Sequence, residues 1–498
     1  MTKDDLKNAI LDTEDEWIGE ALPKSMGRKK RPAVGWRKPA LIAAACAAVF
    51  LAAILLWPKD TGSVSPGKVA HAYALAEAQY PAMTNGDSYY VGSFEEWLNL
   101  TEQERNKMFA EDAAAKEEFN LRFDANKGNG ASLKPFLQKA IAGTLKESKG
   151  ENRLSAPLNL YFALAMLSEA AEGETRQEIL DLIGADSQKT LREQVKKVWL
   201  ANYYDNGYVK CILADSLWLS DSCSYHQKCV DTISDSCFAS VFRGTMGSAE
   251  YDEMLHNWIN EETGNLLQDS VSQLKMDPDQ AAELVSTLFF QDMWKGEFKE
   301  DMTRTRVFHA ASGDKKVEFM HQTDNDAIYF YADHFSAYGK TLKDSGAVMY
   351  FILPDEGMSM DELLEDGQLQ AFLTDETAVH RAEVRINLAV PKFDIAEDRK
   401  LCEVLKSLGV QKVFEAGQAD LGGLLTHEKG AYVSDVLQGA RIIVDEKGVK
   451  AAAYVAIPLY GAGPPSGDII DFVLDRPFLF VLRSRDGLPL LSGVVNAP

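Results

Sequence analysis

The residue types that carry out chemistry in proteins are present in this 498-residue sequence, but not at the spacings of the common catalytic or metal centres. There is no C-x-x-C pair, no H-E-x-x-H and no G-x-S-x-G, which argues against the usual zinc sites and against a nucleophile elbow. His309 and His321 stand alone, and carboxylates are too numerous for any pair to indicate acid–base catalysis. We expect no enzyme, no metal site and no other cofactor.

An alternating segment near the C-terminus is the most regular pattern in the chain. Every second residue is apolar, in the order Val449, Ala451, Ala453, Val455 and Ile457. Because successive side chains of a strand point to opposite faces, these five would share one face. Residues 451–467 also carry no charge, although 26% of the chain is charged. Taken alone, the pattern favours an ordinary buried strand followed by a Gly-Pro turn at 461–467; the two prolines argue against a phosphate-binding glycine loop there.

Composition and charge limit the class of protein further. Asp and Glu number 75 against 52 Lys and Arg, giving a formal net charge of −23. A field of that sign repels phosphate backbones, so we expect no nucleic-acid partner. With 46% hydrophobic residues the chain can bury a sizeable core. Its length suits roughly three units of ~150 residues, or one large domain with appendages.

One apolar segment near the N-terminus is long enough to cross a membrane. Residues 40–57 lack charged and strongly polar side chains and follow the basic residues Arg28, Lys29, Lys30, Arg31, Arg37 and Lys38. Basic residues stay on the cytoplasmic side, so residues 1–39 are expected inside the cell and the rest outside. A cleaved signal peptide, a lipoprotein signal at Cys46 and a buried core helix are the alternatives. The long polar stretch before residue 40 favours an uncleaved single-pass anchor.

The next stretch, residues 58–130, is expected to be a stalk. Residues 61–67 have the composition of a flexible linker. Residues 93–118 suit an exposed helix, with Ser93 as N-cap and Glu96 at the capping-box position. Gly128-Asn129-Gly130 then interrupts the chain.

From about Ser132 onward the sequence predicts an α+β fold with large antiparallel or mixed sheets. Helical periodicity covers residues 135–145, 158–171 and 176–183. Short β-rich runs cover residues 212–219, 284–290, 347–353, 382–390, 441–444, 472–474 and 478–482. Few β-α-β crossings are apparent, which argues against a wholly parallel sheet.

Four of the six cysteines are clustered: Cys211, Cys223, Cys229 and Cys237. So few cysteines in a long chain cannot form a disulfide scaffold. We expect free buried thiols, with a Cys223–Cys229 bridge as the alternative.

Several segments, read in order, resemble the serpin family. Those in the first half are Asn152–Asn159, Gly173-Glu174-Thr175, Trp258–Asn265, and Leu288-Phe289-Phe290 with Trp294 and Phe298. Those in the second half are Phe351–Gly357, Pro391-Lys392-Phe393, Leu405–Phe414, Ala419-Asp420-Leu421, Val433–Val436, Val444–Gly448, Ala451-Ala452-Ala453, Asp475–Phe480 and Gly493–Asn496. Each match is weak by itself, but their common order over residues 131–498 is specific.

The resemblance implies the serpin fold, with a helical cluster, large central sheets and an exposed reactive loop at about residues 446–471. In that family a serine protease cleaves the loop, forms a covalent acyl-enzyme, and is trapped when the loop enters the main sheet as a new strand. The expected protein is thus a bacterial, membrane-anchored, monomeric protease inhibitor at the cell surface. Residues 131–498 would form the serpin domain after the tail, transmembrane helix and stalk.

This mechanism gives the alternating segment a different role. The hinge residues would be Glu446, Gly448, Val449, Ala451, Ala452 and Ala453. If insertion starts at Val449, every inward position is apolar, and small alanines let the strand part its neighbours without overpacking. Gly448 would supply the pivot.

By the family's spacing, the bond offered to the protease lies roughly sixteen residues past Glu446, between Ala462 and Gly463. A small residue there suits elastase- or subtilisin-like proteases. The loop is slightly longer than usual, so Leu459-Tyr460 and Tyr460-Gly461 are the alternatives, and they would suit a chymotrypsin-like pocket.

The family's sheet-opening region corresponds to Ala156, Asn159, Ser286, Trp294 and Gln438. Three of these depart from the usual residues: Ala156 replaces Ser, Ser286 replaces Asn and Gln438 replaces His. Asn159, Ser286 and Gln438 are expected to form a hydrogen-bonded network. With Tyr454 and Pro458 in the loop, these departures keep a second function open, a non-inhibitory serpin-fold binding or structural module.

Overall fold

The computed structural model describes residues 73–81, 100–206, 209–426, 431–433, 436–449 and 469–498. The expected transmembrane helix at residues 40–57, the capping residues Ser93 and Glu96, and the reactive-loop residues 450–468 lie outside these ranges. None of the helices within the described ranges has both the length and the apolar character that crossing a bilayer requires.

An eight-stranded sheet carries the reactive-loop hinge. Its strand order is β1-β5-β4-β6-β14-β13-β12, with β3 paired to β4 beside this path. The strands are β1 (Ala74–Ala76), β3 (Tyr204–Asp205), β4 (Lys210–Ser220), β5 (Ala239–Gly244), β6 (Ala282–Met293), β12 (Phe393–Lys400), β13 (Leu437–Val444) and β14 (Gly448–Val449).

The second sheet has nine strands in the order β15-β11-β8-β9-β10-β16-β17-β2, with β7 paired to β8. Its strands are β2 (Arg153–Ser155), β7 (Arg304–Ala310), β8 (Gly313–Tyr331), β9 (Phe335–Thr341), β10 (Val348–Pro354), β11 (His380–Pro391), β15 (Ile469–Val473), β16 (Phe478–Arg483) and β17 (Pro489–Val495). Both sheets mix parallel and antiparallel pairs, because β4–β5, β6–β13 and β11–β15 are parallel.

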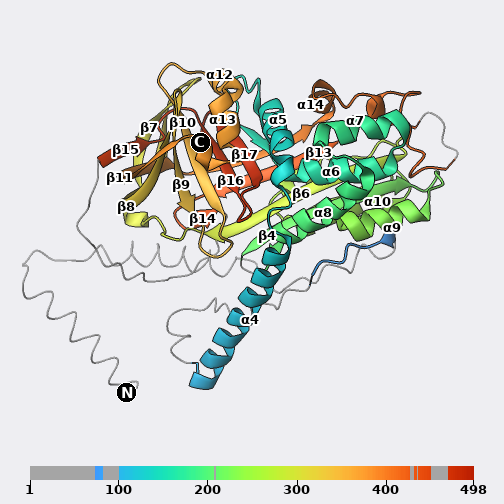
Figure 1. Cartoon of the computed structure of the whole chain (residues 1–498), viewed down its shortest axis with the longest axis horizontal. Coiled ribbons are helices and arrows are strands. Elements are labelled where there is room, and N and C mark those ends of the chain that lie inside the picture. Colours follow the sequence, from blue (N-terminus) through green and yellow to red (C-terminus); the bar gives the residue numbers. More distant parts are fainter. Residues whose placement is uncertain (1–72, 82–99, 207–208, 427–430, 434–435, 450–468) are drawn as a thin grey trace, which may run out of the picture. The chain divides into compact units, whose positions relative to one another are not determined.

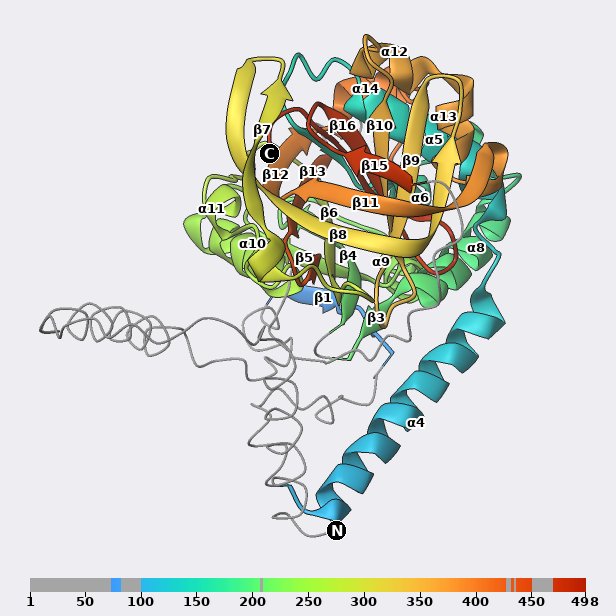
Figure 2. The same cartoon turned by 90° about the vertical axis from the view of Figure 1, so that its left-hand side faces the viewer.

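Helices cover the eight-stranded sheet on both faces (Figures 1 and 2). The helices of the described ranges are α4 (Glu102–Asn126), α5 (Lys134–Leu145), α6 (Pro157–Ala170), α7 (Gly173–Ile183), α8 (Gln188–Asn202), α9 (Gln227–Cys237), α10 (Ala249–Glu262), α11 (Gln268–Val271), α12 (Met360–Glu365), α13 (Gly367–Phe372) and α14 (Cys402–Ser407). Of these, α12 and α13 pack against β9, β10 and β16 of the nine-stranded sheet. Asn159 of α6 bonds to Ser286, the register partner of Asp215, whereas Trp258 of α10 lies 6.4 Å from Trp218. Residues 215 and 218 of β4 are three positions apart, so their side chains lie on opposite faces of the sheet. Helices α6 and α10 therefore pack on opposite faces of the eight-stranded sheet.

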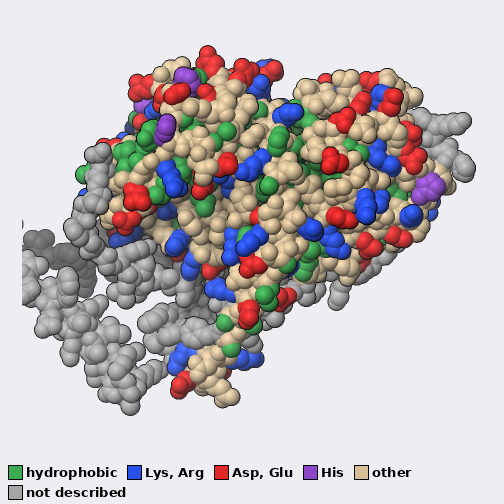
Figure 3. Space-filling view, in the orientation of Figure 1, with side chains coloured by type: hydrophobic (Ala, Val, Ile, Leu, Met, Phe, Trp, Pro, Cys, Tyr) green, Lys and Arg blue, Asp and Glu red, His purple; other side chains and the backbone are tan. Residues whose placement is uncertain are grey.

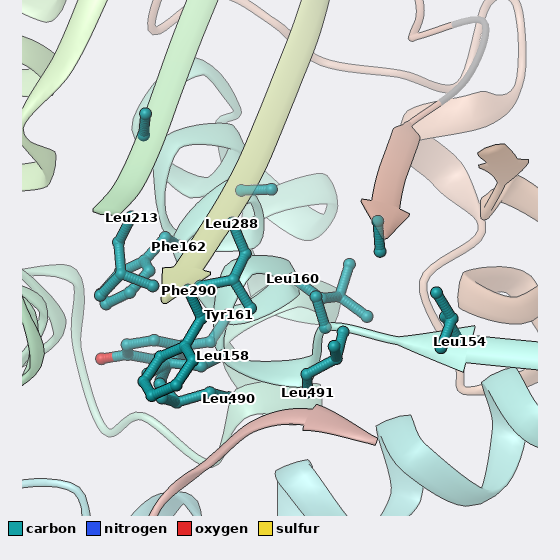
Figure 4. Packing of buried hydrophobic residues seen from close by; sticks show 14 of the residues in the cluster. Leu154, Leu158, Leu160, Tyr161, Phe162, Leu213, Leu288, Phe290, Leu490 and Leu491 are labelled. Carbon is teal, nitrogen blue, oxygen red and sulfur yellow. The ribbon is translucent and has the colours of Figure 1, made fainter. Parts of the chain in front are cut away.

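The main core lies between α6 and the two sheets. All fourteen residues of α6 are buried, including Leu158, Tyr161 and Phe162. Figure 4 shows these side chains packed against others from β4, β6 and β17, such as Leu213, Leu288 and Leu491. A helix that is apolar on every side is typical of a fully buried element, and α6 packs between the two sheets as the central helix of the core.

The segment expected to be a stalk contributes two packed elements. Strand β1 pairs with β5 at the edge of the eight-stranded sheet, and Tyr80 stacks 5.4 Å from Trp199. Phe119 and Phe123 of α4 are buried in the core, whereas its first turns are exposed. The expected start of this helix at residue 93 is wrong: α4 begins at Glu102, where Thr101 and Glu104 form a reciprocal capping box.

The expected secondary structure of the main domain is otherwise confirmed. The helical stretches 135–145, 158–171 and 176–183 correspond to α5, α6 and α7, and each β-rich run falls on a strand. Cys211, Cys223, Cys229 and Cys237 are buried free thiols, so the alternative Cys223–Cys229 bridge is wrong. On the face shown in Figure 3, acidic and basic side chains are interspersed rather than segregated.

Candidate functional site

The hinge of the expected reactive loop is seated inside the eight-stranded sheet. Strand β14 lies between β6 and β13, where Gly448 is opposite Met293 and Val449 is opposite both Asp292 and Val444. Val449 is 2% exposed. Val449, the first residue of the alternating pattern, is thus a buried strand residue paired on both sides.

Gly448 is needed here because the backbones approach closely. A Cβ atom on Gly448 would lie 2.3 Å from the Asp292 carbonyl oxygen and 2.7 Å from the Met293 Cα. Any larger residue would push β14 away from β6. Glycine is therefore required at this position because it has no Cβ atom to clash with β6, and not only because its backbone is flexible.

A short turn after β6 holds the carbonyl groups that precede Gly448. The Trp294 indole N–H donates to the Asp445 carbonyl at 2.9 Å, and the Trp294 and Phe298 amides donate to the carbonyls of Lys447 and Glu446, both at 2.9 Å. Trp294 is 1% exposed. Three successive hinge carbonyls are thus fixed by the turn Trp294–Phe298, which places Trp294 at the hinge.

Glu446 is anchored by a hydroxyl and an ammonium group. Thr303 Oγ1 donates to its carboxylate at 2.8 Å, and Lys392 Nζ lies 3.0 Å from the other oxygen. Burial raises the pKa of Glu446, but the Thr303 and Lys392 contacts outweigh it, so its pKa lies below the ordinary value. Glu446 is therefore an ionised anchor at neutral pH.

Beyond Val449, the middle parts of β6 and β13 are not paired to each other in the described residues. A void of only about 10 Å³ lies between β6 and β13, with Leu288, Phe290, Ala440, Ile442 and Val449 in its lining. Farther along, β6 and β13 pair directly, from Leu437 opposite Val285 to Gly439 opposite Thr287. The sheet is thus open next to the hinge and closed at its far end.

Two pairs of hydrogen bonds hold that closed end onto α6. Asn159 Nδ2 donates to Ser286 Oγ at 3.0 Å and to the Thr287 carbonyl on β6. Gln438 of β13 exchanges two hydrogen bonds with the backbone of Ala156, at 3.1 and 3.2 Å. The expected single network of Asn159, Ser286 and Gln438 is therefore divided: Gln438 bonds to Ala156 instead, and Asn159 Oδ1 has no hydrogen-bond partner.

A buried carboxyl group that the sequence analysis missed adjoins this closed end. Asp215 of β4 is 0% exposed, is the register partner of Ser286, and makes no hydrogen bond of good geometry through either oxygen. Burial raises its pKa to about 7, and Ser286 offsets only part of that effect. One acidic residue inside the apolar run Ile212–Leu219 was the available signal.

A second carboxyl group supports the open end. Asp292, which faces Val449, accepts hydrogen bonds from the Ser345 hydroxyl at 2.6 Å and the Ser345 amide at 2.8 Å. Burial raises the pKa of Asp292 to about 6, partly offset by those bonds. Its role is to fix the loop around Ser345 beneath the hinge.

The structure divides the expected residues between two places: Glu446, Gly448 and Val449 lie beside Trp294, whereas Ala156, Asn159, Ser286 and Gln438 lie at the far end of β6 and β13. Ala451, Ala452, Ala453, the expected scissile pair Ala462–Gly463 and the alternatives Leu459, Tyr460 and Gly461 lie outside the described residues. Ile469 and Phe472 of β15 resume the chain beyond them, in parallel register with Arg385 and Leu388 of β11. In the ranges that the structure describes, no group of three His, Cys, Asp or Glu residues is arranged to hold a metal ion.

Comparison with known sequences identifies relatives across most of the chain. Serpin-Z2A of Oryza sativa subsp. japonica is 28% identical over 400 residues, which cover 70% of this chain and 92% of that protein. Alpha-1-antiproteinase 2 of Equus caballus is 26% identical over 400 residues, covering 78% and 91%. Alaserpin of Manduca sexta is 27% identical over 383 residues, covering 73% and 92%.

Solved structures share the fold. The thermophilic serpin tengpin in its native state matches with a TM-score of 0.67 and 23% identity, over 74% of this chain and 93% of that one. Thyroxine-binding globulin in complex with thyroxine matches with a TM-score of 0.61 and 19% identity, over 73% and 99%. A family model described as "Serpin (serine protease inhibitor)" matches residues 135–498, more than half of the chain. The chain therefore belongs to the serpin family, whose members are generally protease inhibitors rather than enzymes.

Proposed function

We propose that this serpin is a suicide-substrate inhibitor of serine proteases, which traps the acyl-enzyme by inserting its cleaved loop between β6 and β13. The observation that carries the proposal is the seat of Val449 between those strands, where it pairs with Asp292 of β6 and Val444 of β13. Strand insertion has a defined starting register there, and the small void beyond Val449 is lined mainly by apolar side chains.

The register predicts how far insertion can run before the sheet must open. Extending the antiparallel pairing of β14 with β6 places Ala451 opposite Phe290 and Ala453 opposite Leu288, both in the lining of that void. Val455 would fall opposite Ser286, where β6 and β13 are still paired to each other. The first alanines would thus meet parts of β6 and β13 that are not paired to each other, whereas complete insertion has to break the Asn159 and Gln438 contacts.

The test is a covalent complex. The full-length protein is incubated with elastase or with subtilisin and examined on a denaturing gel, and its melting temperature is measured before and after loop cleavage. We expect a protease-containing band that survives denaturation and a higher melting temperature once the loop is cut. Loop cleavage with neither result would overturn the proposal.

The second candidate is a non-inhibitory serpin-fold binding or structural module. The double hydrogen bond between Gln438 and Ala156 favours it, because it ties β13 to α6 and resists opening. Thyroxine-binding globulin, a structural neighbour described with bound thyroxine, supports such a role for the fold. Cleavage without a covalent band or a gain in melting temperature is the outcome this candidate expects.

The proposed bait is the Ala462–Gly463 bond, which suits elastase- or subtilisin-like pockets, with Leu459-Tyr460 and Tyr460-Gly461 as alternatives. The spacing from Glu446 and the absence of Arg and Lys between Lys450 and Arg476 support this preference. Sequencing the N-terminus of the C-terminal fragment released by each protease identifies the bond.

The proposed location is the cell membrane, with residues 40–57 as a single span, residues 1–39 in the cytoplasm and a monomeric serpin domain outside. The apolar run and the basic residues before it support this orientation. Extraction of the full-length protein by detergent but not by alkaline carbonate, with the serpin domain open to externally added protease, is the expected result. Light scattering of the detergent-extracted protein tests the monomer.

A further inference from the structure

One buried lysine lies directly beneath the turn that holds the hinge. Lys340 of β9 is 5% exposed, and its ammonium donates to the Gly296 carbonyl at 2.7 Å and to Gln322 Oε1 at 2.5 Å. The ammonium also lies 4.5 Å from the Phe298 ring centroid and 5.5 Å from that of Trp294. The ammonium thus contacts the centre of the turn through one hydrogen bond and the two ends of the turn through aromatic rings, while Gln322 fixes it to β8.

The same turn is the support of the hinge. The donors at its two ends, from Trp294 and Phe298, hold the carbonyls of Asp445, Glu446 and Lys447. The Lys295 amide donates to the Thr341 carbonyl next to Lys340, which adds a backbone contact between turn and β9. Lys340 thus reaches the hinge through one intermediate element.

We propose that Lys340 is a positioning residue that pins the Trp294–Phe298 turn and thereby sets the register in which the reactive loop enters the sheet. Register matters because a slip of one residue reverses every side chain of a strand. Such a slip would turn Lys450 and Ala452 toward the core in place of Val449 and Ala451. This inference rests on the proposed inhibitory function for its kinetic consequence, but its structural consequence is independent of that function.

The structural consequence is tested on the uncut full-length protein. Lys340→Met keeps a long apolar stem and removes the charge, whereas Lys340→Arg keeps the charge. We expect Lys340→Met to lower the hydrogen-exchange protection of the Trp294 and Phe298 amides at least tenfold, while Lys340→Arg retains it. Lys316→Met, on the exposed part of β8, is the control and should leave this protection unchanged.

The kinetic consequence is measured with subtilisin or elastase as the stoichiometry of inhibition. We expect Lys340→Met to require at least three times more serpin per protease trapped, with an unchanged rate of loop cleavage, because mis-registered loops are released as cleaved substrate. Lys340→Arg should behave as the wild type.

A pH profile adds a measurement that does not require the Met variant to fold. Burial lowers the pKa of Lys340 to about 8, partly offset by Asp324 of β8, which itself accepts a hydrogen bond from Tyr338 of β9. The turn contributes Glu297, whose charged neighbours are Lys343, Lys447 and Asp445. Protection of the Trp294 and Phe298 amides in the wild type should fall between pH 7 and 9, and should stay level in Lys340→Arg.

The outcomes separate this inference from the proposed function. Unchanged amide protection in Lys340→Met, or loss of protection in Lys340→Arg, overturns the positioning role. Amide protection of Trp294 and Phe298 that does not change between pH 7 and 9 in the wild type overturns the positioning role as well. If the amides respond as expected but no variant forms a covalent complex, the positioning role stands and the inhibitory function fails.

Discussion

The Lys392 ammonium and the Glu446 carboxylate form an ion pair of 3.0 Å at the point where the hinge leaves β13. Lys392 immediately precedes β12, which pairs with β13 along its whole length. The pair therefore joins the hinge to the start of β12, and Thr303 adds a second contact to the same carboxylate.

Glu446→Gln should destabilise the uncut protein by about 1 kcal/mol, because both partners are partly shielded from water but not fully buried. The Glu446 pKa is depressed in the folded state, so this stabilisation is present at neutral pH and is lost as the pH falls through the folded pKa. Chemical unfolding of both proteins at pH 7 and pH 3 measures the difference. An equal loss at both pH values would contradict the ion-pair explanation.

Asp215→Asn should stabilise the protein at alkaline but not at acidic pH. Because burial raises the Asp215 pKa to about 7, the folded state prefers the neutral acid, and stability falls as the pH rises from about 4 through 7. Removing the charge should therefore add about 2 to 4 kcal/mol at pH 8 relative to pH 5. Urea unfolding at the two pH values measures this gain.

The exposed Asp301→Asn is the control for Asp215→Asn and should show no such pH-dependent gain. A gain of equal size in both variants would attribute the effect to net charge rather than to burial.

Gly448→Ala should displace the hinge, because its Cβ would overlap the Asp292 carbonyl oxygen. Overpacking of this kind costs about 1 to 3 kcal/mol, and we expect a lower melting temperature together with faster proteolysis near residue 448. Gly367→Ala is a matched control at the start of α13, where a Cβ would meet no atom within 4 Å. Equal melting temperatures of the two variants would argue against close backbone contact at the hinge.

The two faces of the inserting segment should respond oppositely to charge. Ala453→Arg would place a guanidinium opposite Leu288 in the sheet interior and should reduce the yield of covalent protease complex at least tenfold, since an unpaired buried charge is strongly unfavourable. Ala452→Arg places the same group on the other face and should retain most of the complex. Quantitative gels with subtilisin compare the two, and equal yields would show that the loop does not insert in this register.

Much of the fold could be predicted from local periodicity in the sequence. The sequence predicted the buried helix α6 from its uninterrupted apolar run and the strands β4, β6 and β10 from their residue patterns. It also predicted the family from the ordered motifs around Trp294 and Pro477. Buried positions repeat with the period of a helix or a strand, so the pattern of apolar residues in the sequence indicates which positions are buried. The alternation of apolar residues likewise predicts burial of Val449, which is 2% exposed.

The sequence did not predict which distant residues and strands contact each other. Nothing local marks Ala74–Ala76 as an edge strand of the sheet, and nothing in the surroundings of Lys340 points to the turn at Trp294. Gln438 bonds to Ala156 rather than to Asn159, a choice that depends on how β13 packs against the residue preceding α6.

The sequence by itself thus determined the family, most of the helices and strands, and the alternation of apolar residues in the segment that begins at Val449. Only the tertiary structure decided which side chains support the hinge, because those contacts join residues far apart in the chain whose proximity depends on how whole sheets and helices pack.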